Sequence, residues 1–279
     1  MSVLIKLREF RNLPSAENEV RKFVLKNAKK VLTMTVYDVA KESYTSPATV
    51  VRLCKKLETK GFNQFKILLA AEINAFDFMN LELLDTTNIL KNDTPTTIVD
   101  KITNIAIQSI EETRILANIS ELKEVAEKLL SADIIDLFGV GASNIVALDA
   151  TYKFMRIGKN VSCYQLSDRQ YVQAVNSSSN HIGIIFSYSG ETLEMIKILN
   201  ILQKNGCPVV AITCSSSNTL AKLADFSLPV STRESLFRSG AMASRITQLY
   251  IVDILYALCC SIDYDNAKEM VLKTRISTK

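Results

Sequence analysis

Three short, uninterrupted apolar runs in the second half of the chain constrain its fold more than any other feature. The runs cover residues 134–138, 182–186 and 209–212, and segments with helical periodicity separate them. A strand that is apolar on both faces is typical of a parallel sheet covered by helices on both sides. The sequence therefore predicts an α/β fold for this half of the chain, with a doubly wound parallel sheet.

The first 78 residues have a different character, because their apolar residues recur at helical spacing and their charge is positive. They hold 14 Lys or Arg and 8 Asp or Glu, a net charge of +6, whereas the other 201 residues hold 19 and 21, a net charge of −2. A basic segment on a near-neutral body favours a polyanionic partner for that segment alone. We expect an all-α N-terminal domain over residues 1–78.

Two short helices are predicted at 36–43 and 47–57, and the three residues between them give helix-turn-helix spacing. Ser46 followed by Pro47 is a strong signal for the start of the second helix. Apolar residues at 50, 53, 54 and 57 would pack inward. The opposite face is predicted to contact double-stranded DNA through Ser46, Ala48, Thr49, Arg52, Lys55 and Lys56. An ordinary amphipathic helix with a solvated basic face has the same spacing, and the surrounding positive charge favours DNA.

The motif S-x-A-T-V-V-R at 46–52, followed by G-F-x-x-F at 61–65, resembles the N-terminal domain of the RpiR family of bacterial regulators. The resemblance implies that Thr49 and Arg52 face DNA. The chain departs from the family at Tyr44, where the turn normally carries Gly, and at Glu58-Thr59, where Gly-Phe is usual. Because a residue other than Gly in a left-handed conformation costs about 1 kcal/mol, we expect a slightly remodelled turn.

Glycine and hydroxyl residues follow two of the predicted strands. Gly139 and Gly141 stand in G-V-G-A-S after the first apolar run, and S-Y-S-G-E-T at 187–192 follows the second. Loops at the carboxyl ends of parallel strands form ligand crevices, and backbone N–H groups at helix starts attract anions. The hydroxyls of Ser143, Ser187, Ser189 and Thr192 add neutral donors suited to a phosphate monoester. Ser and Gly also serve any ordinary strand-to-helix turn, but two such loops in one sheet favour an anion site.

This pair of loops resembles the SIS (sugar isomerase) domain from about residue 110 to 260, together with I-T-C-S-S-S-N-T-L-A and R-I-T-Q-L-Y-I-V-D-I-L-Y. The resemblance implies that Ser143, Ser187, Ser189 and Thr192 bind phosphate and that Tyr188 and Gly190 contribute backbone groups. An RpiR-type helix-turn-helix followed by a SIS domain is the signature of RpiR regulators. We therefore expect a DNA-binding regulator of carbohydrate metabolism genes whose DNA affinity is modulated by a bound phosphorylated sugar.

The alternative is a sugar-phosphate isomerase or lyase with a helical accessory domain. Such an enzyme needs a base over the reacting carbons, commonly His or Glu. His181, the single histidine, precedes its strand and so lies at the opposite end of the sheet, and Glu191 begins a helix, where a carboxylate favours the dipole. We therefore expect no enzymatic activity, and we expect neither a cofactor nor a metal site.

The organisation of the chain follows from a helix stop at 92–96, Asn-Asp-Thr-Pro-Thr. We expect a helical linker over 79–107 and a SIS domain over 108–279. The apolar stretch 246–262 carries Gln248 and Asp253 and is too short for a bilayer span, so no membrane association is expected. The predicted protein is cytoplasmic and forms a homodimer or a dimer of dimers, which would place two helix-turn-helix units about one DNA turn, ~34 Å, apart.

Overall fold

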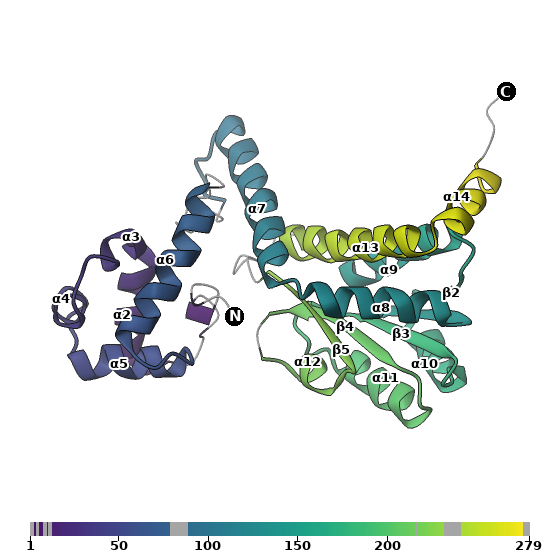
Figure 1. The fold of residues 1–279 in the computed structure, drawn as a ribbon, viewed down its shortest axis with the longest axis horizontal. Helices are drawn as coiled ribbons and strands as arrows, with labels where there is room; N and C mark the ends of the chain where they lie inside the picture. Colours follow the sequence, from purple (N-terminus) through teal and green to yellow (C-terminus); the bar gives the residue numbers. More distant parts are fainter. Residues whose placement is uncertain are drawn as a thin grey trace. The chain divides into compact units, whose positions relative to one another are not determined.

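The computed structural model describes residues 3, 6–7, 10, 13–78, 89–215, 217–231 and 241–275. The chain divides into two compact units, Met1–Asp93 and Thr94–Lys279, which we call unit 1 and unit 2 (Figure 1). The division lies inside the segment predicted as a linker over 79–107. Residues 79–88 of that segment are outside the described residues.

Unit 1 is helical, as the sequence predicts. Its described helices of four residues or more are α2 (Ser15–Lys26), α3 (Ala28–Val31), α4 (Val36–Glu42), α5 (Pro47–Lys56) and α6 (Phe62–Phe78). Helices α4 and α5 pack against each other and form the predicted helix-turn-helix. The core between the helices is apolar and buried, and it includes Val20, Val24, Val39, Val50, Leu53, Leu57, Phe65 and Leu69.

Side-chain caps fix where the two helices of this motif begin. The Thr35 hydroxyl accepts from the backbone N–H of Asp38, and the Asp38 carboxylate accepts from the backbone N–H of Thr35. The hydrogen bond from the Thr35 side chain also lowers the pKa of Asp38. At the start of α5, Ser46 Oγ accepts from the N–H of Thr49, and Pro47 occupies the first turn. Each such cap stabilises its helix by about 1 kcal/mol.

Unit 2 is a five-stranded, fully parallel sheet in the order β2-β1-β3-β4-β5, with helices on both faces. Its strands are β1 (Ile134–Gly139), β2 (Asn160–Cys163), β3 (His181–Phe186), β4 (Val209–Cys214) and β5 (Phe226–Val230). Its helices are α7 (Pro95–Leu116), α8 (Ile119–Ser131), α9 (Ala142–Arg156), α10 (Ser167–Asn176), α11 (Leu193–Lys204), α12 (Thr219–Leu223), α13 (Met242–Ile262) and α14 (Tyr264–Lys273).

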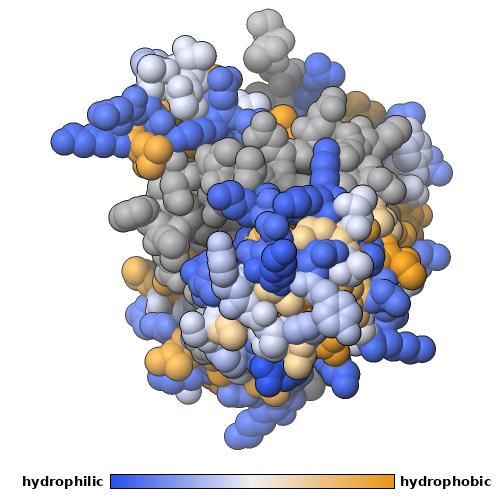
Figure 2. All heavy atoms as spheres, turned by 90° about the vertical axis from the view of Figure 1, so that its left-hand side faces the viewer, coloured by the Kyte–Doolittle hydropathy of each residue, from blue (hydrophilic) through white to orange (hydrophobic). Residues whose placement is uncertain are grey.

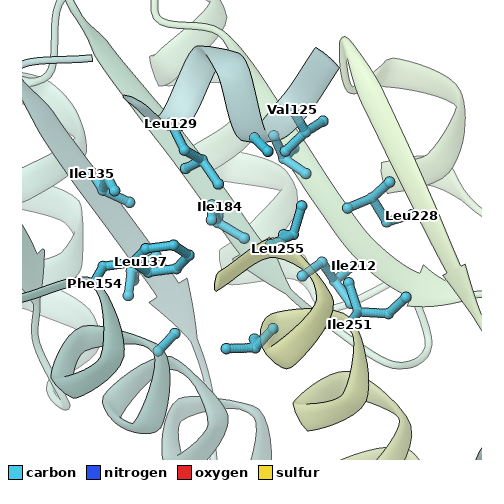
Figure 3. Close-up of a cluster of buried hydrophobic side chains, with 14 of the residues drawn as sticks. Val125, Leu129, Ile135, Leu137, Phe154, Ile184, Ile212, Leu228, Ile251 and Leu255 are labelled. Carbon is cyan, nitrogen blue, oxygen red and sulfur yellow. The ribbon is translucent and has the colours of Figure 1, made fainter. Parts of the chain in front are cut away.

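Two apolar cores hold this sheet between its helical layers. On one face, α8, α9 and α13 cover the sheet; Figure 3 shows Leu129 of α8, Ile184 of β3 and Leu255 of α13 converging there. On the other face, α10, α11 and α12 pack over alternate strand residues such as Phe138 and Ile185 (Figure 1). Strands apolar on both sides therefore have helices on both sides. The predicted fold class, an all-α N-terminal domain followed by a doubly wound parallel sheet, is confirmed.

Helix α7 runs without interruption from Pro95 to Leu116, so residue 107, the expected end of the linker, lies inside it. The predicted helix stop marks its start instead, because the Thr94 hydroxyl accepts from the N–H of Thr97. Helix α7 packs against α13 and β5 and belongs to unit 2.

Helix α13 contains the apolar stretch 246–262 and begins four residues before it. It spans 21 residues and, by length and composition alone, is long and apolar enough to cross a membrane, a test that the core helix of a soluble protein also passes. One side of this helix nevertheless forms part of the main core of unit 2, where Ile251, Val252 and Leu255 are buried against the sheet. The packing identifies α13 as a core helix.

The helix-turn-helix keeps two left-handed backbone positions without glycine. Tyr44 has φ 54° and Glu58 has φ 62°, at the two places where the chain departs from the family pattern. The expected remodelling of the turn is therefore wrong, since Tyr44 itself adopts the left-handed conformation. It can do so because its side chain is 97% exposed and meets no packing constraint. The remaining cost is local backbone strain.

Replacing Tyr44 with Gly should therefore stabilise unit 1. We expect Tyr44→Gly to raise the free energy of unfolding by up to about 1 kcal/mol, measured by urea denaturation. Tyr37 is the matched control, because it is also exposed but lies inside α4. There, Tyr37→Gly should lower the free energy of unfolding by about 0.5–1 kcal/mol. A loss of stability in both variants would contradict the strain at Tyr44.

Candidate functional sites

The exposed side of α5 carries five of the six residues predicted to contact DNA. Ser46, Ala48, Arg52, Lys55 and Lys56 are exposed. Figure 2 faces the side of the molecule where Figure 1 places α4, and hydrophilic side chains predominate among the coloured atoms there. Through the exposed Ser46, Arg52, Lys55 and Lys56, α5 presents a polar, basic surface of the kind that reaches phosphates and base edges.

Thr49 is the exception, and its expected exposure was wrong. It is 3% exposed, because it lies four residues before Leu53 and so on the buried side of the helix. Its hydroxyl lies 3.0 Å from Ser46 Oγ and accepts from Arg52 Nη2 at 3.2 Å. Thr49 therefore holds the Arg52 side chain rather than presenting its own hydroxyl to a partner.

Glu17 of α2 is a residue of this surface that sequence reasoning missed. Helix α2 packs against α5, and the Glu17 carboxylate forms ion pairs with Lys56 Nζ at 2.6 Å and Arg52 Nε at 3.7 Å. In the sequence, Glu17 is one of eight acidic residues in the basic segment 1–78. Its partners lie more than 30 residues away along the chain, so only the packing of α2 on α5 reveals the contact.

The two glycine and hydroxyl loops of unit 2 meet at one cavity. It has a volume of about 410 Å³ and lies where β1 and β3 end and where α9 and α11 begin. The strands are direct neighbours, and Gly139 pairs with Phe186, so their carboxyl ends are level. The cavity is lined by Val140, Ala142, Ser143, Phe186, Ser187, Tyr188, Ser189, Thr192, Ala241 and Ser244.

The predicted phosphate-binding hydroxyls thus line the same cavity. Ser187 Oγ lies 3.0 Å from Thr192 Oγ1, and Ser189 Oγ accepts from the N–H of Glu191 at 3.2 Å. Gly141 and Thr192 are the N-caps of α9 and α11, and neither provides a side-chain cap to its helix. The first N–H groups of two helices therefore open toward this region without side-chain caps, an arrangement that suits an anion.

Gly190 shapes the second loop although it does not line the cavity. Its φ is +65°, and an added Cβ would lie 1.9 Å from Asn218 Oδ1. Asn218 cannot move aside freely, since its side chain accepts from the N–H of Ala221 and donates to the carbonyl of Cys214. Only glycine fits here.

Glu191 and His181 lie outside the residues that line this cavity. The Glu191 carboxylate accepts from Thr219 N and Thr219 Oγ1, both at 2.8 Å, and the hydrogen bond from the Thr219 side chain lowers the pKa of Glu191. His181 Nδ1 lies 2.7 Å from the buried Asp136 carboxylate, at the start of β3, and lines a different cavity of about 650 Å³. The placement of His181 at the far end of the sheet follows the sequence expectation, whereas Glu191 does not begin a helix: it precedes the N-cap Thr192 of α11 and binds the start of α12 instead.

Sequence reasoning missed the contribution of α13. Ser244 lines the cavity, and one turn further on Gln248 Oε1 lies 3.5 Å from Ser143 Oγ. Gln248 Nε2 is buried and has no hydrogen-bond partner among the described residues. The sequence signal for this contribution is Gln248, a polar residue within the apolar stretch 246–262.

Comparisons with known proteins identify both units. A model of the rpiR-family helix-turn-helix domain matches residues 1–75, and a model of the SIS domain matches residues 128–258. An HTH-type transcriptional regulator of Caldanaerobacter subterraneus is 35% identical over 95% of this chain and 92% of its own length.

Two solved structures of similar proteins support the same relationship. The Vibrio vulnificus NanR protein complexed with ManNAc-6P is 28% identical, with a TM-score of 0.60 over 98% of this chain and 96% of that one. The sugar isomerase domain of an RpiR transcription factor from Sphaerobacter thermophilus shares the fold, with a TM-score of 0.57 and 18% identity over 63% of this chain and 97% of that one.

A helix-turn-helix unit joined to an α/β unit of the SIS type defines a DNA-binding transcriptional regulator. The chain belongs to the rpiR family of such regulators. Both resemblances drawn from the sequence motifs are confirmed.

The steric limit at Gly190 predicts a large effect of a single methyl group. Gly190→Ala should lower the free energy of unfolding of unit 2 by about 1–3 kcal/mol, because strain and overlap with Asn218 add. Gly206 is the control: its φ is +70°, but an added Cβ would meet nothing closer than 3.8 Å. Gly206→Ala should cost only about 1 kcal/mol of backbone strain. Equal losses in urea denaturation would show that Asn218 gives way.

Proposed function

We propose that unit 1 binds double-stranded DNA through the exposed face of α5 and that the cavity of unit 2 binds the phosphate of a phosphorylated sugar. Binding of the sugar phosphate changes the affinity for DNA and so the expression of carbohydrate metabolism genes. The DNA contacts are assigned to Ser46, Ala48, Arg52, Lys55 and Lys56, with Thr49 holding Arg52. The phosphate contacts are assigned to Ser143, Ser187, Ser189 and Thr192, with backbone groups of Tyr188 and Gly190.

The observation that carries the proposal for unit 2 is that Ser143 and the 187–192 loop line one cavity. Its volume, about 410 Å³, is within the range of small-molecule sites. Neutral hydroxyls and helix N-termini hold a phosphate without a fixed cation, which suits reversible binding. The similarity of the whole chain to a NanR protein complexed with ManNAc-6P supports a phosphorylated sugar as the class of ligand.

The isomerase alternative has less support. The described residues that line the cavity include no His, Asp, Glu or Lys. Glu191, the carboxylate in the second loop, is bonded to Thr219. The similar chain from Caldanaerobacter subterraneus is named as a transcriptional regulator. We therefore assign unit 2 a sensing role without catalysis.

A route from the cavity to unit 1 runs through α13 and α7. Ser244 of α13 lines the cavity, α13 packs against α7, and α7 is the first described helix of unit 2 after the chain leaves unit 1. A ligand that shifts α13 would therefore act on the helix next to the connection. Coupling of this kind is typically ~1–3 kcal/mol, a several-fold to hundredfold change in DNA affinity.

We further propose that the protein is cytoplasmic, binds no membrane and acts as a homodimer or a dimer of dimers. One face of α9 carries exposed apolar side chains at helical spacing: Ile145, Leu148, Tyr152 and Met155. Such a stripe suits a self-complementary contact between two copies. Two copies of the helix-turn-helix would then read two half-sites about one DNA turn apart.

The cavity assignment is tested by a thermal-shift screen of the full chain against sugar phosphates, ManNAc-6P among them. A compound that binds the folded state raises the melting temperature. In Ser189→Ala/Thr192→Ala the shift and the effect on DNA affinity should disappear, because two hydrogen bonds to a charged group contribute about 3 kcal/mol or more. DNA binding without the compound should stay intact.

Thr219→Ala is the matched control, since this hydroxyl belongs to the first residue of α12 and does not line the cavity. It should keep both responses. A double variant that still responds would place the phosphate elsewhere.

A further inference from the structure

Glu17 is a nearly buried carboxylate beneath the basic face of α5. It is 4% exposed, in the first turn of α2, and it forms ion pairs with Lys56 Nζ at 2.6 Å and Arg52 Nε at 3.7 Å. Both cations belong to the predicted DNA-binding surface. The Glu17 carboxylate therefore lies beside two of the three basic side chains of this surface, Arg52 and Lys56, and not beside the third, Lys55.

Arg52 is held from two sides by this arrangement. Its Nε faces the Glu17 carboxylate, and its Nη2 donates to Thr49 Oγ1 at 3.2 Å. The side chain is still 63% exposed. Arg52 is therefore oriented by neighbours on its inner side while its outer side stays accessible. A guanidinium that is already oriented loses less conformational freedom when it binds.

Lys55 and Lys56 are adjacent in sequence and both exposed, yet their surroundings differ. Lys56 is paired with Glu17, whereas Lys55 has no ion pair with any residue that the structure describes. A DNA phosphate that binds Lys56 must compete with Glu17 and leaves a nearly buried carboxylate beside a polyanion. A phosphate that binds Lys55 meets no such competitor.

We propose that Glu17 is a specificity-determining residue of the DNA-binding unit. Its carboxylate neutralises Lys56 and orients Arg52, so that, among the basic side chains of α5, Lys55 contributes most to sequence-independent attraction to phosphates. Weak binding to random DNA increases the discrimination between sites, because specificity is a difference of two affinities. The assignment rests on the proposed function only in requiring that unit 1 binds duplex.

The test measures binding of the full chain to a fluorescently labelled, random-sequence duplex as salt is varied. Glu17→Gln should bind this duplex on the order of tenfold more tightly at ~50 mM salt, and the slope of log affinity against log salt should steepen by about 0.9, the value for one added phosphate contact. Glu19→Gln is the matched control, because Glu19 lies on the same helix but is exposed and pairs with Lys22. It removes the same charge and should leave the slope unchanged.

The two lysines give an independent test in the unaltered background. Lys55→Ala should reduce the slope by about 0.9, whereas Lys56→Ala should reduce it by less than half as much. In the Glu17→Gln background Lys56→Ala should cost as much as Lys55→Ala, since coupled residues depart from additivity. These lysines are exposed, so this comparison stands even if Glu17→Gln does not fold.

The outcomes distinguish a failure of the role proposed for Glu17 from a failure of DNA binding by unit 1. Equal slopes for Glu17→Gln and Glu19→Gln, or equal effects of the two lysine variants, would overturn the role of Glu17 while unit 1 remains a DNA-binding unit. No binding of any duplex by the unaltered chain would overturn the proposed function itself.

Discussion

The parallel pairing of β1 with β3 is the constraint on which the ligand site depends. The sheet order β2-β1-β3-β4-β5 means that the chain moves from β1 to one side and returns to β3 on the other. As a result α9, which follows β1, and α11, which follows β3, lie on opposite faces of the sheet (Figure 1). A crevice opens at such a reversal of strand order. The hydroxyls of Ser143 and of the 187–192 loop face it because both loops end at the same level of the sheet.

In unit 1, function depends on how charge is distributed as well as on its sum. The net charge of +6 over the first 78 residues overstates what α5 offers to a phosphate, because Glu17 already pairs with Lys56 and Arg52. The contact with Glu17 also orients Arg52, the side chain of α5 most suited to bidentate recognition of a base. Stability and recognition therefore share residues: Thr49 and Ser46 complete the start of α5 and at the same time support Arg52.

Much of the fold could be predicted because its signals are local. Strands β1, β3 and β4 are buried on both faces and appear as apolar runs, and Thr35, Ser46 and Pro47 mark helix starts by side-chain chemistry. The two edge strands lack that signal. Strand β2 has four partly exposed residues, and β5 contains a proline, as edge strands often do.

The sites were predictable to the extent that they lie in single loops. The 187–192 loop is one contiguous motif, and its hydroxyls were identified from the sequence. Glu17, Ser244 and Gln248 reach their sites only through helix packing across long stretches of chain, so no local pattern reports them. Thr49 was misplaced because its position at the edge of the buried face depends on the rotation of α5 against its neighbours.

We propose that the cationic helical unit binds DNA while a separate cavity binds a phosphorylated sugar. The most direct measurement is the affinity of the full chain for its selected operator across a range of salt, with and without a saturating sugar phosphate identified by thermal shift. We expect the logarithm of the affinity to fall linearly with the logarithm of the salt concentration, and the line to be displaced when the compound is present. A salt-independent affinity, or a line that no bound compound displaces, would contradict it.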